Sequence, residues 1–204
     1  MRTSIFIAFL LITQSAFANT FEQDIVRAAK ERATYNIRYD GAYFSIKYPG
    51  GDVPADIGVC TDVIIRAYRK LGTDLQKLVH EDIDNNFNKY PSNRIWGLTK
   101  PDKNIDHRRV PNLQAFFKRH GTSLPISEIA NDYKPGDLVT WMLPKNLPHI
   151  GIVINKLDSN TGNPLIVHNI GSGPETSDIL FSYKITGHYR YVPNKYNHGV
   201  ELTQ

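Results

Sequence analysis

Residues 57–72, IGVCTDVIIRAYRKLG, contain both the clearest helix pattern of this chain and its single cysteine. Apolar residues recur there at i, i+4, i+7 and i+11, which marks one buried face of a helix: Cys60, Ile64, Ala67 and Leu71. A glycine at position 72 is a typical helix stop. The pattern therefore predicts a helix from about residue 58 to residue 71, with Cys60 in its first turn.

The remaining helix patterns precede a series of strand patterns. Helices are expected at 21–34, near 74–87 and at 112–119, the last opened by Pro111. Short β-like runs follow at 138–141, 150–154, 165–170 and 183–191. A turn cluster at 158–163 predicts that the second and third of these runs form a hairpin. Helices followed by strands favour an α+β domain, in which helices pack on an antiparallel sheet.

The N-terminal segment has the pattern of a secretory signal peptide. Arg2 precedes a short apolar run, and the small-residue site Ala16-Phe17-Ala18 follows it. The alternative is an uncleaved anchor, but the run is shorter than the ~20 residues that span a bilayer. We therefore expect residues 1–18 to be removed. Residues 19–204 would then form one periplasmic domain, with an insertion around 73–134 and no stable membrane span.

The composition narrows the classes of partner. The apolar fraction of 41% is that of a globular protein with a real core. The formal net charge is +4, but lysines and arginines are dispersed among acidic residues rather than gathered in one block. Nucleic acid is therefore not an expected partner.

Cys60 is the first candidate for a catalytic residue. Exported proteins commonly use cysteines in disulfides, whereas this chain has one cysteine. Such a thiol is either a small apolar residue of the core or is kept for its chemistry. The free N–H groups and the dipole of a helix start lower the pKa of a thiol placed there, so the position predicts a reactive nucleophile.

His149 and the next strand supply candidates for a base and its partner. A thiol nucleophile needs a base, and the base needs an orienting group. In the run from His149 to Ile154, alternation places Ile150 and Ile152 against the core and His149 on the opposite face, beside the open space left by Gly151. Histidines at a strand edge that have no catalytic role are the alternative.

The hairpin register decides which residue of the following strand faces His149. An odd sum of paired positions selects His168, and an even sum selects Asn169. We favour His168 and keep Asn169 as the alternative third member. The histidines have no metal-ligand spacing, and H-E-x-x-H is absent from the sequence, so no metal or other cofactor is expected.

Four motifs, in order, resemble the NlpC-type cell-wall cysteine peptidases of the papain-like clan. They are Tyr48-Pro49-Gly50-Gly51 leading to Gly58-Val59-Cys60, then Pro135-Gly136-Asp137-Leu138-Val139, then His149-Ile150-Gly151-Ile152-Val153, and then a polar residue of the next strand, His168 or Asn169. Residues 105–113, IDHRRVPNL, and 186–191, TGHYRY, are more closely similar to a family of exported proteins of the YijF type, which is catalogued as a domain of unknown function. The resemblance implies a papain-like fold with Cys60 as nucleophile, His149 as base and a polar residue of the next strand as third member.

The same resemblance, together with export, implies the function and the binding residues. Cys60 would attack an amide or peptide bond of peptidoglycan and form a thioester acyl-enzyme, with Tyr48 as a second oxyanion donor. Arg108 and Arg109 form either a clamp for a substrate carboxylate or a solvated basic turn. The alternative functions are a non-catalytic module that binds cell-wall peptides, and an acyltransferase with the same triad.

Overall fold

The computed structural model describes residues 19–197. The helices are α1 (Phe21–Arg32), α2 (Cys60–Lys70), α3 (Leu75–Asn85), α4 (Ser92–Trp96), α5 (Val110–His120) and α6 (Asn194–Asn197). Short 3-10 turns lie between them, of which η2 (Asp106–Arg108) borders the site described below. The expected signal peptide, residues 1–18, lies outside the described residues. Between residues 19 and 197, none of the helices combines the length and the apolar character needed to cross a membrane.

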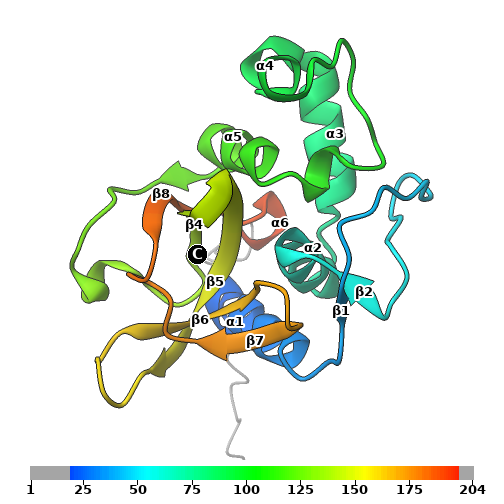
Figure 1. The fold of residues 1–204 in the computed structure, drawn as a ribbon. Coiled ribbons are helices and arrows are strands. Elements are labelled where there is room, and N and C mark those ends of the chain that lie inside the picture. Colours follow the sequence, from blue (N-terminus) through cyan, green and yellow to red (C-terminus); the bar gives the residue numbers. More distant parts are fainter. Residues whose placement is uncertain (1–18, 198–204) are drawn as a thin grey trace, which may run out of the picture.

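A six-stranded sheet packs against helices α1, α2 and α5 (Figure 1). Its order is β3-β8-β4-β5-β6-β7, and every neighbouring pair is antiparallel. The strands are β3 (Thr122–Ser123), β4 (Leu138–Leu143), β5 (Leu147–Leu157), β6 (Pro164–Asn169), β7 (Pro174–Ser177) and β8 (Lys184–Arg190). A separate parallel pair, β1 (Arg38–Tyr39) and β2 (Ile57–Gly58), leads the chain into α2. The α+β class with an antiparallel sheet is thus confirmed.

The two faces of the sheet bury different clusters. Ile150, Ile152 and Ile154 of β5 belong to the main core, together with buried residues of α1, α2 and α5. Residues on the opposite face, including Trp141 and Val153, are covered by Tyr133 and Leu180 from two loops. Both faces of the central strands are therefore dry, which is why strand β6 is buried along its whole length.

Most of the long elements follow the periodicity of the sequence. The helix expected at 58–71 and the hairpin expected around 158–163 are present as α2 and as the β5–β6 pair. No periodic pattern predicted β1, β2, β3, β7, α4 or α6, because elements of two to five residues are too short to show a period. The expected insertion, 73–134, contains α3, α4, η2 and α5, and Figure 1 shows α3 and α4 extending away from the sheet.

Candidate active site

A buried ion pair fixes the start of α2. The Asp62 carboxylate accepts the backbone N–H of Val59 at 2.7 Å, which satisfies a donor that the helix itself leaves free. Two nitrogens of Arg108 donate to the same carboxylate, both at 3.0 Å. Both side chains are only 3% exposed. Gly58 leaves room for this carboxylate, since a Cβ there would lie only 3.2 Å from the Asp62 Cβ.

Cys60 occupies the first turn of α2 and is 5% exposed. Burial raises the pKa of its thiol to about 12, and the neighbouring charge of Asp62 acts in the same direction. The backbone N–H groups of Ile150, Thr61 and Cys60 itself oppose this shift without cancelling it. The expectation that the helix start lowers the pKa of this thiol is therefore wrong, because desolvation outweighs the helix dipole at this depth.

The register of the β5–β6 hairpin brings His168 to His149. Ile152 pairs with Val167 and Val153 with Ile166, so the paired numbers have an odd sum. His149 Nε2 lies 3.1 Å from His168 Nδ1, and the two rings meet edge to face. The structure thus confirms that His168, which we favoured over Asn169, is the residue in contact with the His149 ring.

Gly151 has a different role from the one expected. A Cβ at this position would lie 2.5 Å from Ile166 Cγ2 and 3.2 Å from His168 Cβ. The space beside His149 is therefore filled by strand β6 and is not open. Glycine permits the close approach of β5 and β6 that holds the two imidazoles together.

The hydrogen bonds continue beyond His168. Its Nε2 lies 2.7 Å from Ser177 Oγ and 3.6 Å from a carboxylate oxygen of Glu175. If His149 is to accept a proton at Nδ1, its own proton must be on Nε2 and be donated to His168 Nδ1. His168 then carries its proton on Nε2 and donates it to Ser177. One tautomer for each ring satisfies the whole chain.

The imidazoles of His149 and His168 are both neutral at neutral pH. Burial, followed by the charge of His168, lowers the pKa of His149 to about 3. Burial lowers the pKa of His168 to about 4. The resting site consequently combines a neutral thiol with a neutral base.

Asn169, the alternative third member, connects β6 to the segment before Cys60. Its Nδ2 lies 3.4 Å from the carbonyl oxygen of Gly58, and its Oδ1 accepts the N–H of Gly171 at 3.1 Å. Within residues 19–197, these are its hydrogen bonds, and neither joins it to His149. The side chain is suited to holding the entry into α2 in place.

Strand β5 carries the candidate base next to a residue that acts on the thiol. The backbone N–H of Ile150 lowers the pKa of Cys60, and His149 is the adjacent residue. The His149 ring packs beside Trp141, with the ring centroids 5.9 Å apart, and is not among the side chains that line the cavity beside the sulfur. In the described part of the chain, the thiol and the imidazole are not themselves hydrogen-bonded. Such contacts are often long in free enzymes and tighten when substrate binds.

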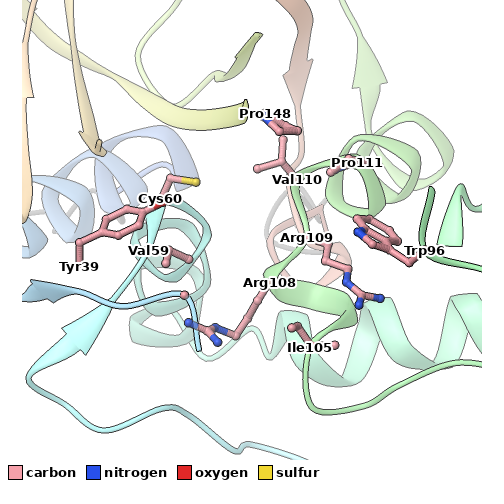
Figure 2. Close-up of a pocket in the computed structure, with 11 residues that line it drawn as sticks. Tyr39, Val59, Cys60, Trp96, Ile105, Arg108, Arg109, Val110, Pro111 and Pro148 are labelled. Carbon is pink, nitrogen blue, oxygen red and sulfur yellow. The ribbon is translucent and has the colours of Figure 1, made fainter. Parts of the chain in front are cut away.

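A cavity of about 240 Å³ opens beside the sulfur. Figure 2 shows the Cys60 side chain pointing from α2 into this space, toward Pro148 and Val110. The remaining lining comes from the loop before α2 and from the insertion: Tyr39, Gly41, Val59, Trp96, Ile105, Arg108, Arg109 and Pro111. The insertion therefore builds one wall of the cavity, and the helix start and β5 build the other.

Tyr48 lies away from this cavity, and Tyr39 takes the place expected for it. The ring of Tyr48 packs edge to face on His80 of α3. Its loop is tied to the start of α3, where Asp74 and Gln76 accept the N–H groups of Gly50 and Gly51, each at 2.8 Å. Tyr39 lines the cavity, and burial followed by the charge of Cys60 raises the pKa of its hydroxyl.

The two adjacent arginines have separate environments. Arg108 uses four of its five N–H donors, because besides two bonds to Asp62 it donates to the carbonyl oxygens of Ala42 and Asp40. Arg109 stacks its guanidinium on the Trp96 ring, 4.1 Å from the centroid, at the cavity wall (Figure 2). The expected pair is thus not a joint clamp, since Arg108 is bound to Asp62 and most of the spare donors belong to Arg109.

Comparison with known proteins shows the family of this chain. Residues 26–191 match the family model described as "Domain of unknown function (DUF1287)". A protein of Escherichia coli (strain K12) with the printed name "Uncharacterized protein YijF" is 49% identical over 167 residues, which cover 82% of this chain and 80% of that protein. The chain belongs to the DUF1287 family.

The matched DUF1287 segment contains the whole candidate site, from Tyr39 to Ser177. Sequence reasoning missed Tyr39 and Trp96 within it. Tyr39 is the last residue of the two-residue strand β1, and Trp96 ends a five-residue helix. Neither position carries a periodic signal. Among the described residues of this DUF1287 domain, no group of three or more His, Cys, Asp or Glu side chains is placed to hold a metal ion.

Proposed function

We propose that this protein is an exported, periplasmic thiol hydrolase with a papain-like, NlpC-type domain, which cleaves amide or peptide bonds of peptidoglycan. The observation that carries the proposal is the hydrogen-bonded chain His149–His168–Ser177, which begins on the strand whose Pro148 lines the cavity beside Cys60. A nucleophile, a base and a group that orients the base are the minimum for covalent acyl transfer. Support for export and for the substrate comes from the signal-peptide pattern and the resemblance to NlpC-type peptidases.

The neutral resting pair determines how the reaction would begin. A buried thiolate and imidazolium would both be poorly solvated, so separating charge before substrate binds is unfavourable. In the proposed first step, His149 Nδ1 takes the thiol proton as Cys60 Sγ attacks the carbonyl carbon. The C–N bond then breaks, the leaving amine receives that proton, and a thioester remains.

Water completes the cycle. His149 takes a proton from the attacking water, the C–S bond breaks, and the thiol of Cys60 regains a proton. The oxygen that becomes negative during both steps needs donors that face the cavity. The N–H groups at the start of α2 and the hydroxyl of Tyr39 are the donors that we propose for it.

The test uses purified residues 19–204, intact peptidoglycan and isolated muropeptides, with product masses as the readout. We expect hydrolysis products from the wild type and a loss of about 10³-fold or more in Cys60→Ala and His149→Ala. His120→Ala is a matched histidine control, because His120 lies at the exposed end of α5. It should retain activity.

Two other outcomes would support the alternative functions, a binding module or an acyltransferase. Binding of muropeptides without products, equally in the wild type and Cys60→Ala, would identify a binding module and contradict the hydrolase. Products that carry a new amide or ester would identify an acyltransferase. In that case the triad is retained, and an amine or hydroxyl replaces water as the acyl acceptor.

A further inference from the structure

We propose that the cavity beside Cys60 selects substrates that carry a carboxylate near the scissile amide, and that the Arg109 guanidinium, stacked on Trp96, binds it. This inference rests on the proposed hydrolase function and names the substrate class of the same site. It concerns Arg109 alone, because the neighbouring Arg108 is bound to Asp62.

The charge balance of the cavity favours an anion. Its only charged lining side chains are Arg108 and Arg109, and none of its lining residues is acidic. The positive charge of Arg108 is matched by the carboxylate of Asp62, with two contacts of 3.0 Å. The positive charge that remains for a ligand is therefore that of Arg109.

The donors of Arg109 are largely unused. Within the described residues, its one ion pair is a long contact of 3.4 Å from Nη1 to Asp106 Oδ1. Asp106 also accepts the N–H of Asp102 at 2.6 Å and faces the amide of Asn112. Asp106 thus has partners of its own, and most of the five N–H groups of Arg109 are available for a carboxylate.

The surroundings hold the guanidinium in a defined plane. Its carbon lies 4.1 Å from the centroid of the Trp96 ring, and the Arg109 side chain is 17% exposed. Ile105, Val110 and Pro111 make the adjacent wall apolar. A preoriented fork beside apolar surface binds a carboxylate with two parallel hydrogen bonds more strongly than a mobile surface cation does.

The size of the cavity indicates which part of the substrate it takes. A volume of about 240 Å³ is smaller than the roughly 300–1,000 Å³ of sites that enclose a whole ligand. The cavity therefore suits one unit of a peptide whose carboxylate reaches Arg109, while the amide to be cleaved lies at Cys60.

The first experiment measures binding without turnover. Cys60→Ala protein is titrated by calorimetry with a disaccharide-tetrapeptide muropeptide and with the same muropeptide after carbodiimide-mediated conversion of its carboxyls to carboxamides. We expect the carboxamide form to bind about 10–100-fold more weakly, which is the usual effect of losing a charged hydrogen-bonded pair. Equal affinity for the two forms, or no binding of either at millimolar concentration, overturns the proposal.

The second experiment assigns the preference to Arg109. In the Cys60→Ala background, Arg109→Gln should bind both forms alike, and Arg109→Lys should recover only part of the preference because it lacks the planar fork. Arg94→Gln removes an exposed arginine from the same helix as Trp96 and should leave the preference intact. Preference retained in a folded Arg109→Gln protein contradicts the proposal.

The hydrolysis assay separates this proposal from the previous one. If the wild type cleaves both forms of the muropeptide at equal rates, the hydrolase stands and the carboxylate site falls. If the wild type releases no product while Cys60→Ala still prefers the carboxylate form, the carboxylate site stands and the hydrolase falls.

Discussion

At the scale of single residues, the site is defined by desolvation rather than by preformed charge. Cys60 and His149 are almost completely buried. Burial raises the pKa of the Cys60 thiol and lowers the pKa of His149, so that both groups are neutral. Papain-like chemistry is often described with a thiolate and an imidazolium in the resting site. In the proposed hydrolase, burial of both groups favours proton transfer that occurs together with attack on the substrate.

The first prediction concerns the reactivity of the thiol. Iodoacetamide reacts with the thiolate, and burial raises the pKa of Cys60 to about 12. The alkylation rate of the folded protein should therefore be slow at pH 7 and rise about tenfold per pH unit up to pH 10. The single cysteine makes the labelled mass unambiguous. A plateau reached below pH 8 would show that the thiolate forms near neutrality and would contradict this description.

The second prediction separates His168 from Asn169. His168 is expected to act by positioning His149, so His168→Ala should lower kcat about 100-fold or more and should change the tautomer of His149 seen in nitrogen-15 NMR spectra. Asn169→Ala removes the contacts to Gly58 and Gly171 and should cost roughly 1 kcal/mol of stability, with the His149 spectrum unchanged. An unchanged His149 tautomer in His168→Ala would refute the positioning role.

At the scale of elements, the site depends on how closely η2 approaches α2 and how closely β6 approaches β5. The Arg108–Asp62 pair joins η2 to the first turn of α2, and Gly151 lets β6 approach β5. The Cys60 helix and the histidine strands are therefore held by contacts outside the reacting residues. Substitutions at these contacts should therefore lower the free energy of unfolding without changing the reacting groups themselves.

The third prediction tests the link between η2 and α2. Arg108→Met leaves the buried Asp62 carboxylate without its cation, and we expect a loss of about 3–5 kcal/mol in the free energy of unfolding, measured with urea. Arg94→Met, on the exposed face of α4, should change it by no more than about 0.5 kcal/mol. Equal effects of the two substitutions would mean that the buried pair does not stabilise the helix start.

The fourth prediction tests the close approach of β5 and β6. Gly151→Ala would place a methyl group 2.5 Å from Ile166 Cγ2, so the strands must move apart. We expect a loss of roughly 1–3 kcal/mol of stability and a weakened contact between His149 and His168. Gly162→Ala is not a matched control because its φ is 74°, whereas Gly41→Ala meets only Val59 at 3.8 Å and should be tolerated. A Gly151→Ala protein as stable as the wild type would contradict the close packing.

At the scale of the whole molecule, buried neutral histidines should make stability depend on pH. Burial is the main cause that lowers the pKa of His107 and His149 to about 3 and that of His168 to about 4. Their ordinary pKa is near 6.5, so the unfolded chain binds more protons than the folded one below that pH. The contribution of these three neutral histidines to the free energy of unfolding is fully present above about pH 6.5 and is lost as the pH falls toward 3.

The fifth prediction follows from this linkage. Between pH 7 and pH 4, the melting temperature of the wild type should fall, and replacing His107 with Gln should make the fall less steep, because His107 lies outside the His149–His168 pair and is 2% exposed. Arg94→Gln, at an exposed position of α4, should leave the slope unchanged. A melting temperature constant over this range would refute the linkage.

Local patterns of the sequence determined the main elements of this protein and the candidate nucleophile and base. The spacing of apolar residues in α2 and the alternation in β5 are local properties, so they predict which face of each element is buried. The turn cluster before β6 indicated the hairpin. These predictions needed only the periods of a helix and a strand and the conformational preferences of turn residues.

Tertiary structure alone decided the parity of the hairpin register, the neutral state of the thiol and the imidazoles, the replacement of Tyr48 by Tyr39, and the different environments of Arg108 and Arg109. The pKa of Cys60 depends on how much water the packed chain excludes, and the role of each arginine depends on acidic partners distant in sequence. Such properties arise between segments that no local period connects. They become defined only when the sheet, the helix start and the insertion close around one cavity.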